Sequence, residues 1–151
     1  STSASKCIEA ETCFGKGAGE LDMVLNVGWM ASGRTREVEK ELRLLRQAVP
    51  LAVLKLILET CYLDERQKRL ACQLALETGW DYVRTSTGFG RAGATLEDVR
   101  LMKSAVGDAL GVKASGGIRD YETARQYIQA GATRIGTSSG PAIVRGAEST
   151  P

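Results

Sequence analysis

The chain has 151 residues, 43% of them hydrophobic and 25% charged, which is typical of a globular domain with a core and excludes a disordered or fibrous chain. Its 20 basic and 18 acidic residues are interleaved and leave a net charge of +2, so we expect neither nucleic acid nor a membrane as partner. The absence of histidine excludes Ser-His-Asp triads and histidine metal sites.

The N-terminal residues lack the apolar core of a signal peptide, and no apolar run reaches the roughly 18 residues of a membrane span, so the cytoplasm is the expected location. The cysteines show no C-x-x-C spacing, which predicts reduced structural thiols and no zinc site. They are Cys7, Cys13, Cys61 and Cys72.

Five short apolar segments recur along the chain, each followed by a polar or glycine-bearing turn and a stretch of helical periodicity. We predict strands at Glu20–Asn26, Ala52–Glu59, Tyr82–Ser86, Gly111–Ser115 and Thr133–Thr137. A helix from Ser3 to about Phe14 precedes the first strand. The alternation predicts right-handed βαβ units and a parallel sheet.

Capping residues mark three of the helices between these strands. They indicate one helix from Asp64 to Gly79, one beginning at Thr95 with Asp98 in a capping-box arrangement, and one from Asp120 to Gly131. No linker or change of composition divides the chain. We therefore expect one domain over residues 1–151.

The predicted strands have two different faces, because alternate residues of a strand point to opposite sides. One face is apolar, whereas the other carries Asp22, Lys55, Arg84 and Lys113 on four successive strands. A doubly wound sheet is apolar on both faces, so the pattern favours an α/β fold of partial TIM-barrel type. Five βα units are too few for a closed barrel of about 250 residues, so either the sheet is open or strands are missing.

The four inward charges have two interpretations. They can form a structural ion-pair network, since a buried charge is costly unless it is paired or functional. Alternatively, a lysine beside another cation has a lowered pKa and becomes an amine nucleophile.

Glycine-rich turns follow the later strands. The segment Gly88–Gly93 fits the G-x-G-x-x-G pattern of dinucleotide sites, but its strand and the following strand lack the usual context. The turns Thr85–Phe89, Ala114–Arg119 and Gly136–Gly140 offer backbone N–H groups and hydroxyls, which favours a phosphate site. Glycines that only form tight turns are the alternative.

Five segments together resemble one family, deoxyribose-phosphate aldolase, whose strand motifs follow in the same order. These are Glu20–Asn26, Leu54–Thr60, Val83–Phe89, Val112–Arg119 and Gly131–Ser139. The resemblance implies the last five units of an eight-unit barrel, with the first three absent. It also implies cleavage of 2-deoxy-D-ribose 5-phosphate to D-glyceraldehyde 3-phosphate and acetaldehyde through a lysine imine, without metal or other cofactor.

The resemblance assigns a role to each inward charge. Asp22 matches the aspartate that moves protons through water, and Lys55 matches a lysine that positions this aspartate and the substrate. Lys113 matches the lysine that lowers the pKa of the Schiff-base lysine, and Arg84 stands at the Schiff-base position itself. The phosphate contacts fall on Gly88, Gly116, Gly117, Arg119, Ser138 and Ser139.

Two features depart from the family pattern. A guanidinium, with a pKa above about 12, is no amine nucleophile, so Arg84 cannot form the imine. The segment Ala147–Pro151 also offers no counterpart of the tyrosine that some members use. We therefore expect impaired catalysis in an aldolase relative whose ligand is a small phosphorylated sugar.

Two further hypotheses stay open. The first is a non-catalytic sugar-phosphate-binding protein or an assembly module, and the second, weaker one is a small nucleotide-binding oxidoreductase. Because an open sheet leaves edge strands unpaired, we also expect a homo-oligomer or a complementing chain.

Overall fold

The computed structural model describes residues 1–151 and contains one sheet of five parallel strands in the order β1-β2-β3-β4-β5. The strands are β1 (Glu20–Val24), β2 (Val53–Ile57), β3 (Tyr82–Arg84), β4 (Gly111–Ser115) and β5 (Arg134–Gly136). All but β4 are shorter than predicted. Hydrogen bonds nevertheless continue past two strand ends, from Leu25 N–H to the Ile57 carbonyl and from Leu58 N–H to the Arg84 carbonyl, both 2.9 Å.

Helices alternate with these strands. They are α1 (Ser3–Gly15), α2 (Val27–Ala31), α3 (Thr35–Ala48), α4 (Glu65–Glu77), α5 (Leu96–Val106), α6 (Tyr121–Gln129) and α7 (Gly140–Glu148), with a 3-10 turn η1 (Thr60–Tyr62) after β2. None of them is long and apolar enough to cross a membrane. The helices follow the predicted βα order, and α1 begins at the predicted residue.

The predicted N-terminal caps are confirmed, but the capping-box arrangement of Thr95 with Asp98 is not, because the Asp98 carboxylate accepts from Lys68 over 2.6 Å instead. Asp64 begins α4 in a reciprocal capping box with Gln67, and the side chains of Thr95 and Asp120 accept hydrogen bonds at the N-termini of α5 and α6. Both C-terminal glycines lie two residues beyond their helices, with a φ of 77° at Gly79 and 119° at Gly131. They end the helices because glycine adopts this left-handed conformation without strain.

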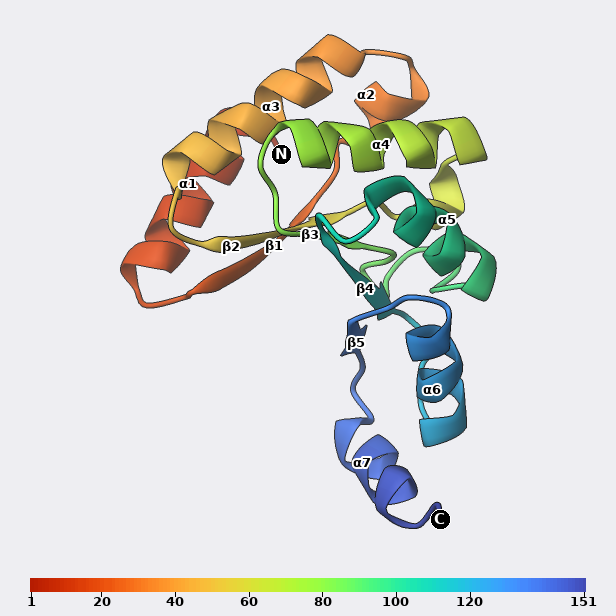
Figure 1. Cartoon of the computed structure of the whole chain (residues 1–151). Helices are drawn as coiled ribbons and strands as arrows, with labels where there is room; N and C mark the ends of the chain where they lie inside the picture. The colour runs from red at the N-terminus through yellow and green to blue at the C-terminus, as the bar shows by residue number, and fades with distance from the viewer.

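One face of the sheet is packed against helices, and α1, α3, α4 and α5 lie on this side (Figure 1). The apolar residues of β2, β3 and β4 are buried there, and Leu54, Leu58, Val83 and Val112 have no exposed surface, whereas Leu21 and Met23 on the edge strand β1 are half-buried. The core continues into the helices through Trp80, whose indole N–H donates to a carbonyl of α3 over 3.3 Å.

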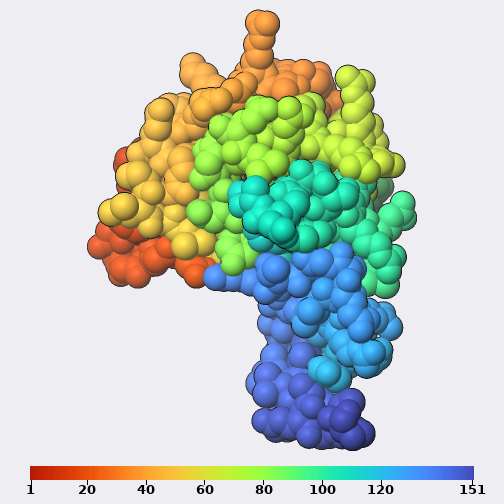
Figure 2. Space-filling model, in the orientation of Figure 1, coloured from red at the N-terminus to blue at the C-terminus, as the bar shows by residue number.

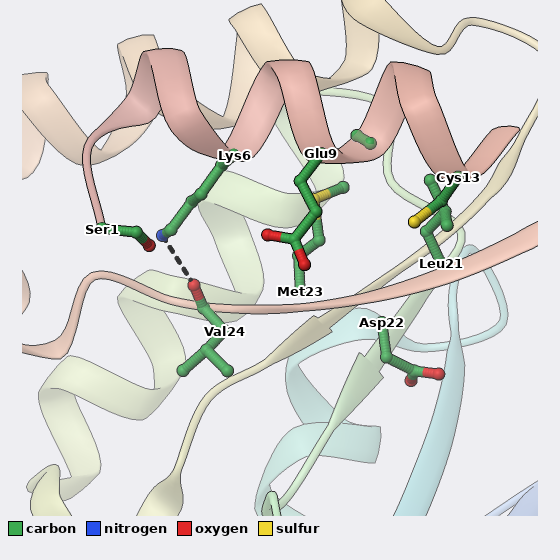
Figure 3. Close-up of a pocket in the computed structure, with 9 residues that line it drawn as sticks. Ser1, Lys6, Glu9, Cys13, Leu21, Asp22, Met23 and Val24 are labelled. Atoms are coloured by element: carbon green, nitrogen blue, oxygen red, sulfur yellow. Dashed lines mark hydrogen bonds between the residues drawn. The ribbon is translucent and has the colours of Figure 1, made fainter. Parts of the chain in front are cut away.

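The opposite face collects the charges, as predicted. Strand register places Asp22 beside Lys55 and Arg84 beside Lys113. Figure 3 shows the alternation directly on β1, where Leu21 and Met23 point toward α1 and Asp22 points to the other side of the strand. The fold is therefore an α/β arrangement of parallel strands and helices that forms part of a TIM barrel.

The sheet is open, and β1 and β5 are its edge strands. Beyond β4 the chain projects away from the main body, so that α6 and α7 pack mainly against each other (Figures 1 and 2). No residue of α7 is buried. The C-terminal units therefore have less support than the units around β1 to β3.

Candidate functional site

The four predicted inward charges lie together on the polar face. Asp22 is their centre: one carboxylate oxygen lies 3.4 Å from Arg84 Nη1 and 3.4 Å from Lys113 Nζ, and the other lies 3.5 Å from Lys55 Nζ. One carboxylate thus faces three cations. Glu20 also pairs with Lys55 and with Arg134, so two carboxylates face four cations, and the polar face keeps a surplus of positive charge suited to an anionic ligand.

Lys113 lies at the edge of this cluster, between Arg84 and β5. Burial lowers the pKa of its ammonium; the Asp22 charge opposes this, and the nearby Arg84 charge adds to it. Space for the amine comes from Gly136, where a Cβ would lie 3.2 Å from Lys113 Cε. The Lys113 ammonium therefore loses its proton more readily than that of an unperturbed lysine.

Arg84 is held in a fixed orientation. Its Nε donates to Ser115 Oγ over 2.8 Å, and this hydroxyl donates to the Ser86 carbonyl over 2.6 Å. Arg84 thus places a permanent positive charge between Asp22 and Lys113, and it has no lone pair for imine formation.

The Lys55 side chain is oriented by Glu20, which was not among the predicted site residues. Its Nζ lies 2.8 Å from Glu20, closer than its 3.5 Å to Asp22, and its side chain is only 3% exposed. Glu20 also pairs with Arg134, which stacks on the Tyr82 ring at 4.6 Å. Hydrogen bonds from Arg134 and then from Lys55 hold the pKa of Glu20 at about 2. The available signal was that Glu20 lies two residues before Asp22 and so shares its strand face.

A polar cleft of about 750 Å³ opens beside Arg84 and Lys113, where the strands end. Of the six predicted phosphate contacts, Gly88, Gly116, Gly117, Arg119 and Ser138 line it, whereas Ser139 does not. The Ser139 N–H instead donates to Thr137 Oγ1 over 2.9 Å. The lining also includes Thr87, Phe89, Ser115 and Thr137, which belong to the predicted glycine-rich turns but were not among the six assigned contacts.

The helix N-termini near the cleft differ in availability. The predicted capping residues already occupy those of α5 and α6, through Thr95 and Asp120. The N-terminus of α7 has no side-chain cap and follows Ser138 directly in the chain. Of these three helices, only α7 therefore has no side chain that already accepts an N–H group of its first turn, although Pro141 in that turn supplies no donor.

The G-x-G-x-x-G segment has a packing explanation. A Cβ on Gly93 would lie 2.3 Å from the Gly116 carbonyl oxygen, and one on Gly90 would lie 3.0 Å from a Glu59 carboxylate oxygen. Helix α5 begins only at Leu96, behind its Thr95 cap. The glycines therefore allow close contacts between loops, and the helix does not begin at the motif as in a dinucleotide fold.

No group of three acidic, cysteine or histidine side chains is arranged to hold a metal ion. The four cysteines are unpaired, and burial raises the pKa of the Cys72 thiol to about 12. A thiol with so high a pKa is unreactive at neutral pH.

The fold and the cleft define a (β/α)-barrel protein that carries a lysine-bearing polar site where its strands end. The chain belongs to the DeoC/LacD aldolase family, since the sequence model described as "DeoC/LacD family aldolase" matches residues 2–146.

Similar proteins share much of the sequence. The deoxyribose-phosphate aldolase of Brevibacillus brevis is 54% identical over 150 residues, which are 99% of this chain and 68% of that protein. The deoxyribose-phosphate aldolase of Streptococcus sanguinis is 52% identical over 149 residues, which are 99% of this chain and 68% of that protein.

Solved structures agree with this relationship. The structure named "QR15, an Aldolase" superimposes with a TM-score of 0.92 at 46% identity, covering 96% of this chain and 66% of that one. Deoxyribose phosphate aldolase from Aeropyrum pernix is described as having a unique tetrameric structure. It superimposes with a TM-score of 0.87 at 34% identity, covering 99% of this chain and 63% of that one. The chain thus spans about two thirds of the length of these relatives.

Proposed function

We propose that the chain is the sugar-phosphate-binding part of a deoxyribose-phosphate aldolase, whose reaction is the cleavage of 2-deoxy-D-ribose 5-phosphate to D-glyceraldehyde 3-phosphate and acetaldehyde. The observation that carries this proposal is the Asp22 cluster beside a cleft lined by Gly116, Gly117 and Arg119. Arg84 and Lys113 line one end of the cleft and contact Asp22, which lies outside the lining, and the other end supplies N–H donors and a positive charge for a phosphate.

In the proposed site each charge has one task. Asp22 exchanges protons with the substrate through water, and Lys55 orients Asp22. The phosphate lies against Gly88, Gly116, Gly117, Arg119, Ser138 and the open N-terminus of α7, with Ser139 contributing through the Thr137 turn. Arg84 occupies the position of the imine-forming lysine, so the covalent route through that position is closed and catalysis is impaired.

A non-catalytic sugar-phosphate-binding protein is the second candidate. The fixed geometry of Arg84, which lies 2.8 Å from Ser115 and 3.4 Å from Asp22, favours it. A guanidinium held in this way binds an anion or hydroxyl groups well, and it does so without covalent chemistry.

Titration with 2-deoxyribose 5-phosphate tests the site that both candidates share. We expect Arg119→Ala to weaken binding by roughly tenfold, because it removes a charge-assisted hydrogen bond to phosphate. Arg125→Ala on the exposed face of α6 is the matched control, since Arg125 pairs only with Glu122, at 3.8 Å. Equal affinity of the Arg119→Ala variant and the unmodified chain would remove the proposed phosphate site.

A further inference from the structure

Glu59 follows β2 and has the one strained backbone conformation of the chain. Its φ of 53° makes it the only residue other than glycine with a positive φ. This left-handed conformation costs free energy and persists only where the surroundings impose it. It also breaks the strand alternation, so that Glu59 does not continue the inward face of Lys55 and is not among the residues that line the cleft.

The Glu59 carboxylate is buried without a cation. Only 6% of the residue is exposed, and it takes part in no salt bridge. All its side-chain hydrogen bonds come from Thr87, whose hydroxyl donates over 2.5 Å and whose backbone N–H donates over 3.2 Å. A buried carboxylate is costly, and here one residue of the neighbouring loop satisfies it.

The backbone on both sides of Glu59 is tied to the same loop. Leu58 N–H donates to the Arg84 carbonyl over 2.9 Å, and Thr60 N–H donates to the Thr85 carbonyl over 3.0 Å. These bonds extend the pairing of β2 with β3 beyond the strands. The carboxylate is therefore held at a fixed place beneath the loop that follows β3.

The loop itself is shaped around this contact. Thr87 Oγ1 also accepts the Phe89 N–H over 3.0 Å, which closes a tight turn at Gly88. Gly90 packs on the carboxylate, where a Cβ would lie 3.0 Å from Glu59 Oε1. Farther on, Arg91 Nε donates to the Cys61 carbonyl over 3.0 Å, so the loop is attached to the end of β2 at two points.

We propose that Glu59 is a positioning residue, which anchors the Thr87–Phe89 turn so that the Gly88 backbone and the Phe89 ring face a sugar phosphate in the cleft. Thr87, Gly88 and Phe89 all line the cleft, and the Phe89 side chain is 98% exposed at its rim. An exposed aromatic ring at this place offers an apolar wall to the carbon face of a bound sugar. The inference rests on the proposed function and adds the device that holds one side of the site.

Two measurements test the role on the full chain: hydrogen exchange of the Thr87 and Phe89 amides, and affinity for 2-deoxyribose 5-phosphate. The variants are Glu59→Gln, which removes the charge but keeps an acceptor, Thr87→Val, which removes the donor, and Thr87→Ser, which restores it. Glu41→Gln is the matched control, because Glu41 is also a buried carboxylate, 2% exposed and bonded to Lys6, but lies on α3 away from the cleft.

Glu59→Gln and Thr87→Val are each expected to weaken binding by roughly tenfold, the size of one charge-assisted hydrogen bond. Both variants should speed exchange at Thr87 and Phe89, while the amide of Leu58 in the β2–β3 pairing stays protected. Thr87→Ser should restore both properties. The double variant Glu59→Gln/Thr87→Val should bind the sugar phosphate no more weakly than the single variant with the lower affinity. The reason is that the two residues act through one contact.

The control separates positioning from stability: Glu41→Gln should lower the melting temperature and leave the affinity unchanged. Unchanged affinity in Glu59→Gln and Thr87→Val, with binding intact in the unmodified chain, would overturn the positioning role alone. Failure of the unmodified chain to bind the sugar phosphate would instead overturn the proposed function and the positioning role with it.

Discussion

At the scale of single residues, the difference between guanidinium and amine decides the chemistry of this site. Arg84 and Lys113 are neighbours in the register of β3 and β4, and both lie 3.4 Å from Asp22. A guanidinium is no amine nucleophile, whereas Lys113 carries an amine whose pKa is lowered, chiefly by burial. The amines of the cluster therefore belong to the two adjacent strands, with Lys113 on β4 and Lys55, which is paired with Glu20, on β2.

We expect retro-aldol activity to be absent or very low. The loss should be about 10⁴- to 10⁶-fold relative to an aldolase whose nucleophile is intact. Borohydride reduction with acetaldehyde, followed by mass spectrometry, should find no adduct or a minor one on Lys113. The imine forms when the neutral amine adds to the carbonyl carbon and water leaves. Displacement by one strand spacing, about 4.8 Å, spoils the alignment of this amine.

Arg84→Lys should yield an adduct at residue 84 without full turnover, because the open five-stranded sheet does not enclose the cleft on all sides. Lys113→Met serves as the control that assigns any minor adduct. Stoichiometric labelling of the unmodified chain together with rapid turnover would contradict this account of the site.

At the scale of secondary-structure elements, side chains link strands that the sheet order separates. Glu20 at the start of β1 pairs with Arg134 at the start of β5, although the two strands form opposite edges of the sheet. The sheet must curve strongly for this contact to form. The ion pair thus joins the two edges across the polar face, below Asp22.

This link predicts a pH dependence of stability. The pKa of Glu20 is about 2 in the folded chain against a usual value of 4.5, so its stabilisation is fully present above about pH 4.5 and is lost as the pH falls toward 2. Thermal unfolding of the unmodified chain and of Glu20→Gln should therefore differ at pH 7 and converge at low pH. A difference that stays constant from pH 7 to pH 3 would show that the pair does not stabilise the fold.

Close contact between two loops gives a second prediction at this scale. A Cβ on Gly93 would lie 2.3 Å from the Gly116 carbonyl oxygen, and this backbone atom cannot move aside cheaply. We expect Gly93→Ala to lower the free energy of unfolding by about 1–3 kcal/mol. Gly15→Ala is the control, since nothing lies within 4 Å of a Cβ there. Denaturant titrations of both variants measure the difference, and equal stability would contradict the close packing.

At the scale of the whole molecule, the two open edges of the sheet determine how the chain associates. A pocket of about 280 Å³ lies between α1 and β1 and is lined partly by Leu21 and Met23 (Figure 3). The Val24 carbonyl accepts its hydrogen bond from Lys6, over 2.9 Å, in place of a neighbouring strand. At the other edge, α7 buries none of its residues. Both edges therefore leave strand and apolar surface without a partner.

Because unpaired strands and exposed apolar surface favour association, we expect this chain to self-associate or to require a complementing chain. Light scattering at several protein concentrations should show a mass above 16.2 kDa, the mass of one chain. A compact and monodisperse monomer at all concentrations would refute the prediction.

The sequence by itself determined the order of strands and helices, the caps at Asp64, Thr95 and Asp120, and the face on which Asp22, Lys55, Arg84 and Lys113 lie. These features depend on local propensity and on the two-residue period of a strand, which any single chain displays. The resemblance to the family motifs additionally assigned the residues that surround the proposed phosphate.

Only the tertiary structure decided the contacts between residues far apart in the chain. The pairing of Glu20 with Arg134 depends on how strongly the sheet curves, and the bond of Glu59 to Thr87 depends on a left-handed turn that strand alternation does not predict. Ser139 lies outside the cleft lining, and its N–H donates to the Thr137 hydroxyl. Such contacts are set by the packing of whole elements, so no local pattern in the sequence reveals them.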